Sequence, residues 1–179
     1  MVNPFTVVTV SMPSRHELLY EAYGSLRAQT IGPTPWLIRI DEPEVFGPRH
    51  IATQRNVILK SVETEWIAIL DDDDLFDPDY LEIMAQNLDG ADVAYSFCRD
   101  RGHPQLEFDP QLIRDDVGFI DGECCIRTEA LRSVGGYPVS DVADDYMLWK
   151  LFLKKEMRFR SVPKALRRHR KGAWRTATP

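Results

Sequence analysis

Short apolar runs alternate with amphipathic segments along the chain, and this alternation constrains the fold more than any other feature. The amphipathic segments 16–29, 51–62 and 77–88 repeat apolar residues at helical spacing. Because the apolar runs are nearly continuous, they indicate strands that are buried on both sides, so we expect an α/β fold with a mostly parallel sheet and helices on both faces. The runs are Phe5 to Val10, Trp36 to Ile40, Trp66 to Leu70 and Ala91 to Phe97.

The second half of the chain has a less regular pattern. Residues 98–118 are polar and weakly patterned, which predicts a loop or hairpin over the sheet edge. Order then returns with a short strand at 124–127, a short helix at 129–134, a turn at 135–138, a helix at 143–154 and a strand at 157–162. No internal repeat or linker interrupts this order, so we predict a single domain over residues 1–179.

Composition excludes several classes of protein. Hydrophobic residues make up 44% and charged residues 28% of the chain, as in a soluble globular domain. The longest apolar runs fall far below the roughly 20 residues needed to cross a bilayer, and no leader pattern is evident, so we expect a cytoplasmic protein. The three cysteines include adjacent Cys124 and Cys125 and form no Cys-x-x-Cys pair, which favours reduced packing residues over a zinc site.

Charge is distributed unevenly. The net charge of the chain is −6, yet residues 154–175 hold ten Lys and Arg and a single Glu, a net charge of +9. The body of the chain is correspondingly acidic, which suggests cation sites in the body and an anionic partner for the basic segment. A solvated chain end is the alternative, and no nucleic-acid partner is expected.

Four consecutive carboxylates, Asp71 to Asp74, follow the third apolar run. Two like charges about 4 Å apart repel by about 1 kcal/mol in water and about 4 kcal/mol at an effective dielectric of 20, so a divalent cation would relieve the run. The alternative is a solvated loop or a helix cap. Because Asp77 is predicted to cap the following helix, with Pro78 at its first position, helix capping does not account for Asp71 to Asp74.

Other polar residues are predicted to reach the same sheet edge, where ligands bind in such folds. Asp41 ends the second run and Pro13 to Arg15 follow the first, which suits a nucleoside, although Asp41 could be an ordinary turn residue. Arg55 lies on the preceding helix and could equally be a surface cation. Asp144 and Asp145 open a helix, where capping alone would account for them.

Six segments in order resemble the family 2 glycosyltransferases with the GT-A fold, over about Phe5 to Lys171. They are Thr6 to Pro13, Ser25 to Thr30, Arg55-Asn56, Trp66 to Asp74, Val134 to Pro138 and Asp144 to Trp149. The resemblance implies a nucleotide-sugar-binding half at 1–97, an acceptor-side half at 98–153 and a basic segment at 154–179. It also outweighs the capping interpretation of Asp144 and Asp145.

The resemblance implies a role for each candidate residue. Asp73 would ligate Mn²⁺ or Mg²⁺, with Asp71 as a further ligand nearer the ribose and His169 as a third. The donor nucleotide would be held by Pro13, Arg15, Asp41, Arg55, Asp71 and Asp72. Asp145 would be the general base, with Asp144 where the family usually has Glu. Gly122 and the Gly135-Gly136 turn would shape the acceptor pocket. The charge of +9 on residues 154–175, rather than the resemblance, leads us to expect that the basic segment closes over the donor phosphates as a lid.

The implied activity is metal-dependent, inverting transfer of a sugar from a nucleotide-diphosphate donor, a UDP-sugar by expectation, to a hydroxyl of a glycan, lipid or protein acceptor. The chain departs from the family at Pro13-Ser14-Arg15 and at Asp41-Glu42-Pro43, both in the nucleoside pocket. Its acceptor-side segment is short, so a partner subunit, as in a homo-oligomer, could complete the site. A phosphohydrolase of the HAD type and a non-catalytic sugar- or cation-binding relative are the alternatives.

Overall fold

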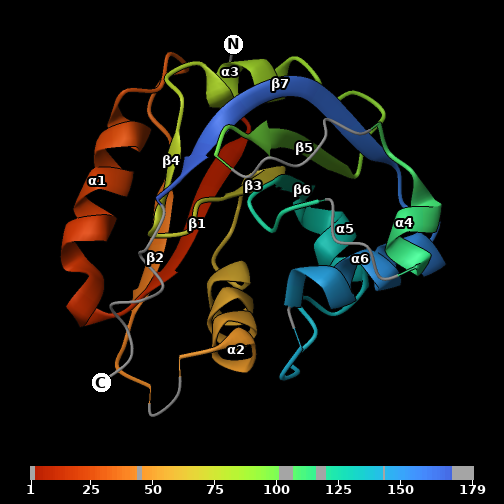
Figure 1. The fold of residues 1–179 in the computed structure, drawn as a ribbon, viewed down its shortest axis with the longest axis horizontal. Coiled ribbons are helices and arrows are strands. Elements are labelled where there is room, and N and C mark those ends of the chain that lie inside the picture. Colours follow the sequence, from red (N-terminus) through yellow and green to blue (C-terminus); the bar gives the residue numbers. More distant parts are fainter. Residues whose placement is uncertain (1–2, 44–45, 101–106, 116–119, 143, 171–179) are drawn as a thin grey trace.

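A curved sheet runs through the computed structural model of the chain, with helices on both sides (Figure 1). The structure describes residues 3–43, 46–100, 107–115, 120–142 and 144–170. Within these residues the strands are β1 (Phe5–Ser11), β2 (Trp36–Ile40), β3 (Trp66–Ile69), β4 (Asp74–Phe76), β5 (Val93–Cys98), β6 (Cys125–Arg127) and β7 (Phe159–His169). They form one sheet in the order β2-β1-β3-β6-β5-β7-β4.

The sheet is mixed in direction. β1 is parallel to β2 and β3, and β5 is parallel to β7. β6 lies antiparallel between β3 and β5, and β4 is antiparallel to β7. The α/β class is therefore confirmed, with two short antiparallel strands, β4 and β6, added to the parallel strands that the sequence predicted.

Helices cover both faces of the sheet, as predicted. Within the described residues the longer helices are α1 (His16–Arg27), α2 (Pro48–Leu59) and α6 (Asp144–Lys154), and the shorter ones are α3 (Tyr80–Ala85), α4 (Pro110–Arg114) and α5 (Thr128–Ser133). None of the described helices is long and apolar enough to cross a membrane.

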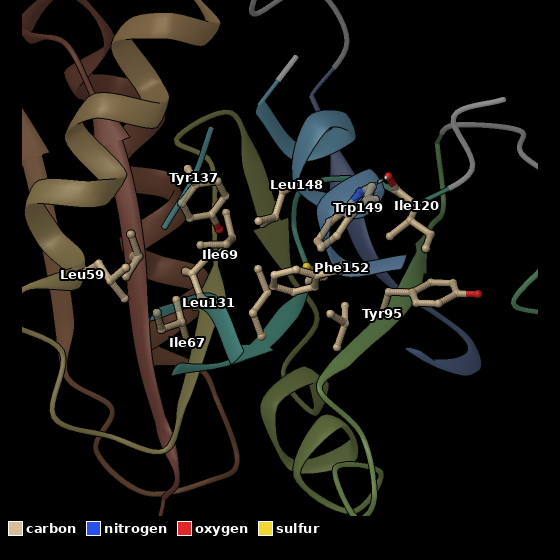
Figure 2. Close-up of a cluster of buried hydrophobic side chains, with 14 of the residues drawn as sticks. Leu59, Ile67, Ile69, Tyr95, Ile120, Leu131, Tyr137, Leu148, Trp149 and Phe152 are labelled. Carbon is tan, nitrogen blue, oxygen red and sulfur yellow. Dashed lines mark hydrogen bonds between the residues drawn. The ribbon is translucent and has the colours of Figure 1, made fainter. Parts of the chain in front are cut away.

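Alternate residues of the central strands point into two separate cores. On one face Val8, Val10, Ile67 and Ile69 pack with side chains from α2, α5 and α6, including the fully buried Phe152 (Figure 2). The other face carries the intervening strand residues, which pack against α1 and α3. Full burial of a large apolar side chain contributes about 1.5–3 kcal/mol, so the α6 side chains fix that helix firmly against the sheet.

The basic segment differs most from its prediction. A strand was predicted only at 157–162, but β7 continues to His169 and lies between β5 and β4. Residues 159–169 are therefore part of the sheet, and the lid prediction is wrong for them; residues 171–179 lie outside the described residues. The register of β7 against β5 shifts between Ser161 and Ala165, where Pro163 cannot donate a backbone hydrogen bond.

Two further local predictions are wrong. Asp77 does not cap α3, because that helix begins at Tyr80 after Asp79; the Asp77 carboxylate instead accepts hydrogen bonds from Arg99. The loop predicted at 98–118 contains the helix α4, whose Asp109 N-cap accepts a hydrogen bond from the Gln111 backbone N–H at 2.8 Å. Residues 101–106 and 116–119 lie outside the described residues.

Candidate active site

The Asp run forms a tight, buried turn between β3 and β4. The Asp74 backbone N–H donates to the Asp71 carbonyl at 3.1 Å, which closes the turn. Asp72, Asp73 and Asp74 are buried, and Asp71 is half-buried. The solvated-loop interpretation is therefore wrong, because these carboxylates are held out of water and need partners within the protein.

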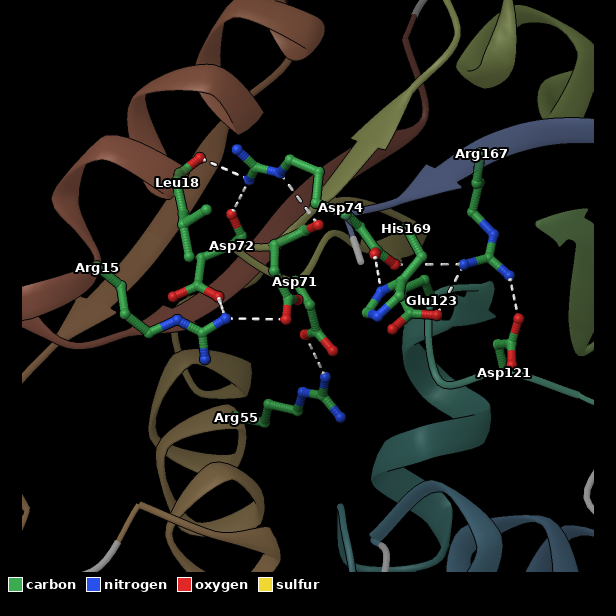
Figure 3. A network of polar contacts seen from close by, with 12 residues as sticks. Arg15, Leu18, Arg55, Asp71, Asp72, Asp74, Asp121, Glu123, Arg167 and His169 are labelled. Carbon is green, nitrogen blue, oxygen red and sulfur yellow. Dashed lines mark hydrogen bonds and ion pairs between the residues drawn. The ribbon is translucent and has the colours of Figure 1, made fainter. Parts of the chain in front are cut away.

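Arg15 pairs with two carboxylates of this turn. The short 3-10 turn Pro13–Arg15 after β1 brings its guanidinium to Asp72 at 2.8 Å and to Asp73 at 2.9 Å (Figure 3). Arg15 is itself buried, and Ser11 also donates to Asp72. Burial nevertheless raises the pKa of Asp72 to about 6, because these partners offset only part of its desolvation.

Arg55 on α2 is buried rather than a surface cation. It donates to Asp71 at 2.7 Å, and its guanidinium lies 5.2 Å from the centre of the Tyr137 ring. The neighbouring Asn56 holds Tyr137 with two hydrogen bonds, donating to its carbonyl at 2.8 Å and accepting from its N–H at 2.7 Å. The predicted grouping of Arg55 with the Asp run is therefore observed.

Asp73, Asp74 and His169 offer one ligand atom each within 4.8 Å of one another. The pairing of β4 with β7 places Asp74 opposite His169, and the Asp74 carboxylate lies 2.7 Å from His169 Nδ1. The second oxygen of Asp74 accepts no hydrogen bond from the described residues, and Arg167 lies 3.6 Å from it. Carboxylate oxygens with one imidazole nitrogen suit Mn²⁺ or a similar divalent cation, so this cluster fits a metal.

The cluster matches the predicted metal ligands in part. Asp73 and His169 are brought together as predicted, whereas Asp71 is outside the cluster and pairs with Arg55. Asp74 completes the cluster, although no individual role was predicted for it. Burial, followed by the nearby charge of Glu123, raises the pKa of Asp74 to about 7.

A buried arginine lies next to Asp74 of the cluster. Arg167 on β7 donates to Glu123 at 2.7 Å and to Asp121 at 2.8 Å. Asp121 and Glu123 were not singled out from the sequence, and Arg167 was considered only as part of the basic segment. The only sequence signal was a pair of acidic residues flanking Gly122, which is weak on its own.

Asp145 lies at the start of α6 against the backbone of Gly122. A Cβ atom added to Gly122 would be 3.2 Å from a carboxylate oxygen of Asp145, so no side chain separates the two. The buried Leu148 and Trp149 hold α6 in place, and Trp149 donates to the Ile120 carbonyl at 3.3 Å. Only the backbone of Asp144 is described, so the structure does not place its carboxylate.

Asp41 follows β2, and its carboxylate lies 2.8 Å from His50 Nε2. The ring of His50 also lies 5.6 Å from that of Phe46. His50 lines a pocket of about 670 Å³ whose other walls are Pro43, Gly47, Pro48, Arg49, Thr53 and Asp141. Asp41 is therefore oriented by an imidazole beside a pocket large enough for a small ligand.

The Gly135-Gly136 turn packs against α2. Both glycines have positive φ, at 86° and 91°. A Cβ atom at Gly136 would lie 2.3 Å from Asn56 Oδ1, so the turn needs glycine there. The turn thus fixes Tyr137 beside Arg55.

Comparison with solved structures identifies the class of protein that this fold defines. TarS from S. aureus, solved in complex with UDP-GlcNAc, is 19% identical and superposes with a TM-score of 0.73 over 98% of this chain and 61% of its own. A mannosyltransferase from Pyrobaculum calidifontis, solved with GDP-Man and Mn²⁺, is 17% identical with a TM-score of 0.67, over 96% of this chain and 59% of its own. Drosophila β1,4-galactosyltransferase 7, in complex with xylobiose, is 14% identical with a TM-score of 0.65, over 96% and 72%. The chain has the GT-A fold of these glycosyltransferases.

A comparison of the sequence with protein-family models identifies the family to which the chain belongs. The model of glycosyl transferase family 2 matches residues 47–136, half of the chain, and the chain belongs to that family. No curated protein sequence matches it. The chain spans about three fifths of the length of the TarS and Pyrobaculum structures. The family match confirms the resemblance and argues against the phosphohydrolase alternative.

Proposed function

We propose that the protein transfers a sugar from a nucleotide-diphosphate donor to an acceptor hydroxyl, with a divalent cation and with inversion at the anomeric carbon. The observation that carries this proposal is the cluster of Asp73, Asp74 and His169 at the sheet edge. Its ligand atoms converge within 4.8 Å, in the part of a mixed α/β sheet where ligands bind. Family membership supports the reaction class.

The donor nucleotide would occupy the ends of β1, β2 and β3. Asp41, whose carboxylate contacts His50, would bind the base, and Asp71 and Asp72, held by Arg55 and Arg15, would lie near the ribose. TarS was solved with UDP and UDP-GlcNAc, and the Pyrobaculum enzyme with GDP-Man. We propose a UDP-sugar as donor for this chain.

In the proposed mechanism Asp145 accepts the proton of the acceptor hydroxyl while its oxygen attacks the anomeric carbon. The bond from that carbon to the diphosphate oxygen breaks on the opposite side, so configuration inverts. Mn²⁺ or Mg²⁺, bound by Asp73, Asp74 and His169, would supply positive charge to the departing diphosphate. The start of α6 favours an ionised Asp145, as a base requires, and Asp144 adds a second carboxylate there.

A ligand screen tests the donor. The melting temperature would be measured with UDP-, GDP-, dTDP- and CDP-sugars, each with and without Mn²⁺, because a ligand that binds only the native state stabilises it by about 2.7 kcal/mol at 100 times its Kd. We expect a shift with UDP-sugars that requires Mn²⁺. If a UDP-sugar raised the melting temperature as much in excess EDTA as it does with Mn²⁺, the metal-dependent part of the proposal would be contradicted.

Two substitutions test the chemistry. Asp145→Asn should lower turnover about 10²- to 10⁴-fold with little change in donor affinity, because it removes the base and keeps the shape. Asp73→Asn should lower turnover and Mn²⁺ affinity together. NMR of the first-formed product should show inverted configuration; retention would contradict single displacement. Donor binding without turnover on any acceptor would support the non-catalytic alternative.

A further inference from the structure

Arg167 is the largest charged side chain that is almost wholly buried in the described structure, with 1% of it exposed. Its guanidinium meets carboxylates from two separate segments (Figure 3). One terminal nitrogen lies 2.7 Å from Glu123 and 3.6 Å from Asp74, and the other lies 2.8 Å from Asp121. Arg167 therefore connects the segment before β6 to the turn between β3 and β4.

Such a buried ion cluster is a poor way to gain stability. Desolvation of the charges offsets most of their attraction, and well-packed apolar residues of similar volume are often as stable. A buried guanidinium does supply fixed geometry, because its donors lie in one rigid plane. The Arg167 cluster is thus better suited to fixing positions than to adding stability.

The segment held by Arg167 is the one against which the Asp145 side chain of α6 packs. Asp121 and Glu123 flank Gly122, and the Asp145 carboxylate approaches that glycine closely enough that an added Cβ would be 3.2 Å away. Any shift of the 121–123 segment would therefore change the backbone position against which the Asp145 side chain packs. The metal cluster is less dependent on Arg167, since Asp74 and His169 are opposite each other in the β4–β7 ladder and 2.7 Å apart.

We propose that Arg167 is a positioning residue that holds the 121–123 segment, and with it Asp145, at a fixed distance from the cluster of Asp73, Asp74 and His169. This inference rests on the proposed function, because it assigns Asp145 the role of base. Arg167 lies too deep to contact a substrate. Its two terminal nitrogens, held in one rigid plane, bind two different carboxylates, whereas lysine offers a single nitrogen on a flexible stem and does not fix the spacing of the two carboxylates.

The test is Arg167→Lys in the full chain, which keeps the charge and removes the two-armed contact. We expect kcat for sugar transfer to fall about 10²-fold, since a misplacement of about 1 Å at a reacting group can have that effect. The Kd for Mn²⁺, measured by isothermal titration calorimetry, and the KM for the donor should change less than threefold. The matched control is Arg132→Lys, because Arg132 on α5 also binds protein groups, but different ones: the Glu129 carboxylate and the carbonyls of Leu59 and Val62.

A second variant, Asp121→Ala, tests the inference if Arg167→Lys does not fold. Asp121 is partly exposed, so Asp121→Ala should fold and remove one arm of the contact. We expect about a tenfold loss of kcat, again with an unchanged Kd for Mn²⁺. A normal kcat in both variants, or in Asp121→Ala alone if the lysine variant does not fold, would overturn the inference.

Other outcomes separate this inference from the proposed function. A parallel loss of Mn²⁺ affinity and kcat in these variants would make Arg167 part of the metal site and overturn its assigned role. If the wild-type chain transfers no sugar from any nucleotide donor, the proposed function itself fails. If the wild type is active and every variant that folds keeps a normal kcat, only the positioning role fails.

Discussion

At the scale of single residues, the four consecutive carboxylates 71–74 are separated by their partners. Asp71 pairs with Arg55, while Arg15 bridges Asp72 and Asp73. Asp74 faces His169 instead. Like-charge repulsion within the run is therefore relieved first by basic side chains of the protein. The case for a metal depends on the convergence of Asp73, Asp74 and His169, and on the additional acids around Arg167.

Gly122 gives a test of how closely Asp145 is held. In Gly122→Ala the new Cβ would lie 3.2 Å from the Asp145 carboxylate oxygen and 3.4 Å from its Cβ, so the carboxylate must move by a few tenths of an ångström. We expect kcat to fall by about one to two orders of magnitude, because proton transfer depends on hydrogen-bond distance. Steady-state kinetics and nucleotide titration would show lost turnover with unchanged nucleotide affinity.

The matched control for that substitution is Gly24→Ala on α1. Among the described residues, no atom apart from the neighbouring backbone of α1 lies within 4 Å of a Cβ at Gly24, so this change should leave turnover as it is and stabilise the helix by about 0.8–1 kcal/mol. Wild-type kcat in Gly122→Ala would show that Asp145 tolerates displacement, or that it is not the base.

At the scale of elements, the Gly135-Gly136 turn follows α5 and packs against α2. Gly136→Ala places a Cβ 2.3 Å from Asn56 Oδ1, which breaks the paired hydrogen bonds to Tyr137. A non-glycine residue at φ 91° adds a cost of about 1–3 kcal/mol, and each lost hydrogen bond about 1 kcal/mol. Urea unfolding should therefore show a loss of about 3–5 kcal/mol.

Gly135→Ala separates the two causes. Its φ is also positive, at 86°, but nothing lies within 4 Å of its Cβ position. We expect a loss of only about 1–3 kcal/mol from backbone strain. Equal losses in the two variants would mean that the Asn56 contact contributes nothing to stability.

An ion pair joins the starts of β5 and β7. Asp92 accepts from the Arg158 backbone N–H at 2.9 Å and from its side chain at 3.2 Å. Burial alone would raise the pKa of Asp92, but the hydrogen bonds and charge of Arg158 outweigh it, so the pKa is lowered from its ordinary value. A lowered folded-state pKa adds stability that is present above the unfolded-state value and is lost as the pH falls through the folded-state value.

Asp92→Asn should therefore lower the melting temperature at pH 7, and its difference from the wild type should shrink once the pH falls below about 3.8. Thermal melts followed by circular dichroism from pH 3 to pH 8 measure this. A difference that stays constant down to pH 3 would show that the ionised carboxylate has no part in the effect.

The elements show where sequence patterns are sufficient and where they fail. The apolar runs of β1 to β3 and the period of α1 and α2 were predicted to within a few residues, because one buried face dictates each pattern. β7 was predicted to end at residue 162, because the basic residues after it, Arg167 and Arg168 among them, were assigned to a lid over the donor phosphates, with a solvated chain end as the alternative. The carboxylates that neutralise Arg167 are 44 and 46 residues away, so its burial was invisible to any local pattern.

At the scale of the whole molecule, the same distinction applies to the site. The rule that ligands bind at the carboxyl ends of parallel strands brought Arg15, Arg55 and the Asp run together correctly. The metal cluster was predicted in part, because Asp74 meets His169 only through an antiparallel pairing 95 residues apart. Pairings of this kind follow from the sheet order and not from the residues near either partner.

The sheet order also predicts that the two proposed halves cannot fold separately. β6 lies between β3 and β5, and β7 lies between β5 and β4, so a fragment of residues 1–97 loses strands from the interior of its sheet. It also loses Leu148, Trp149 and Phe152 from the core beneath β3. With so much less buried surface, the fragment can no longer offset the conformational entropy that a chain loses on folding.

We expect the fragment to show no cooperative unfolding in urea and few dispersed amide signals in NMR, with the full chain under the same conditions as control. A cooperative transition in the fragment would mean that residues 1–97 are a domain in their own right, and that the acceptor side was added to a fold already complete.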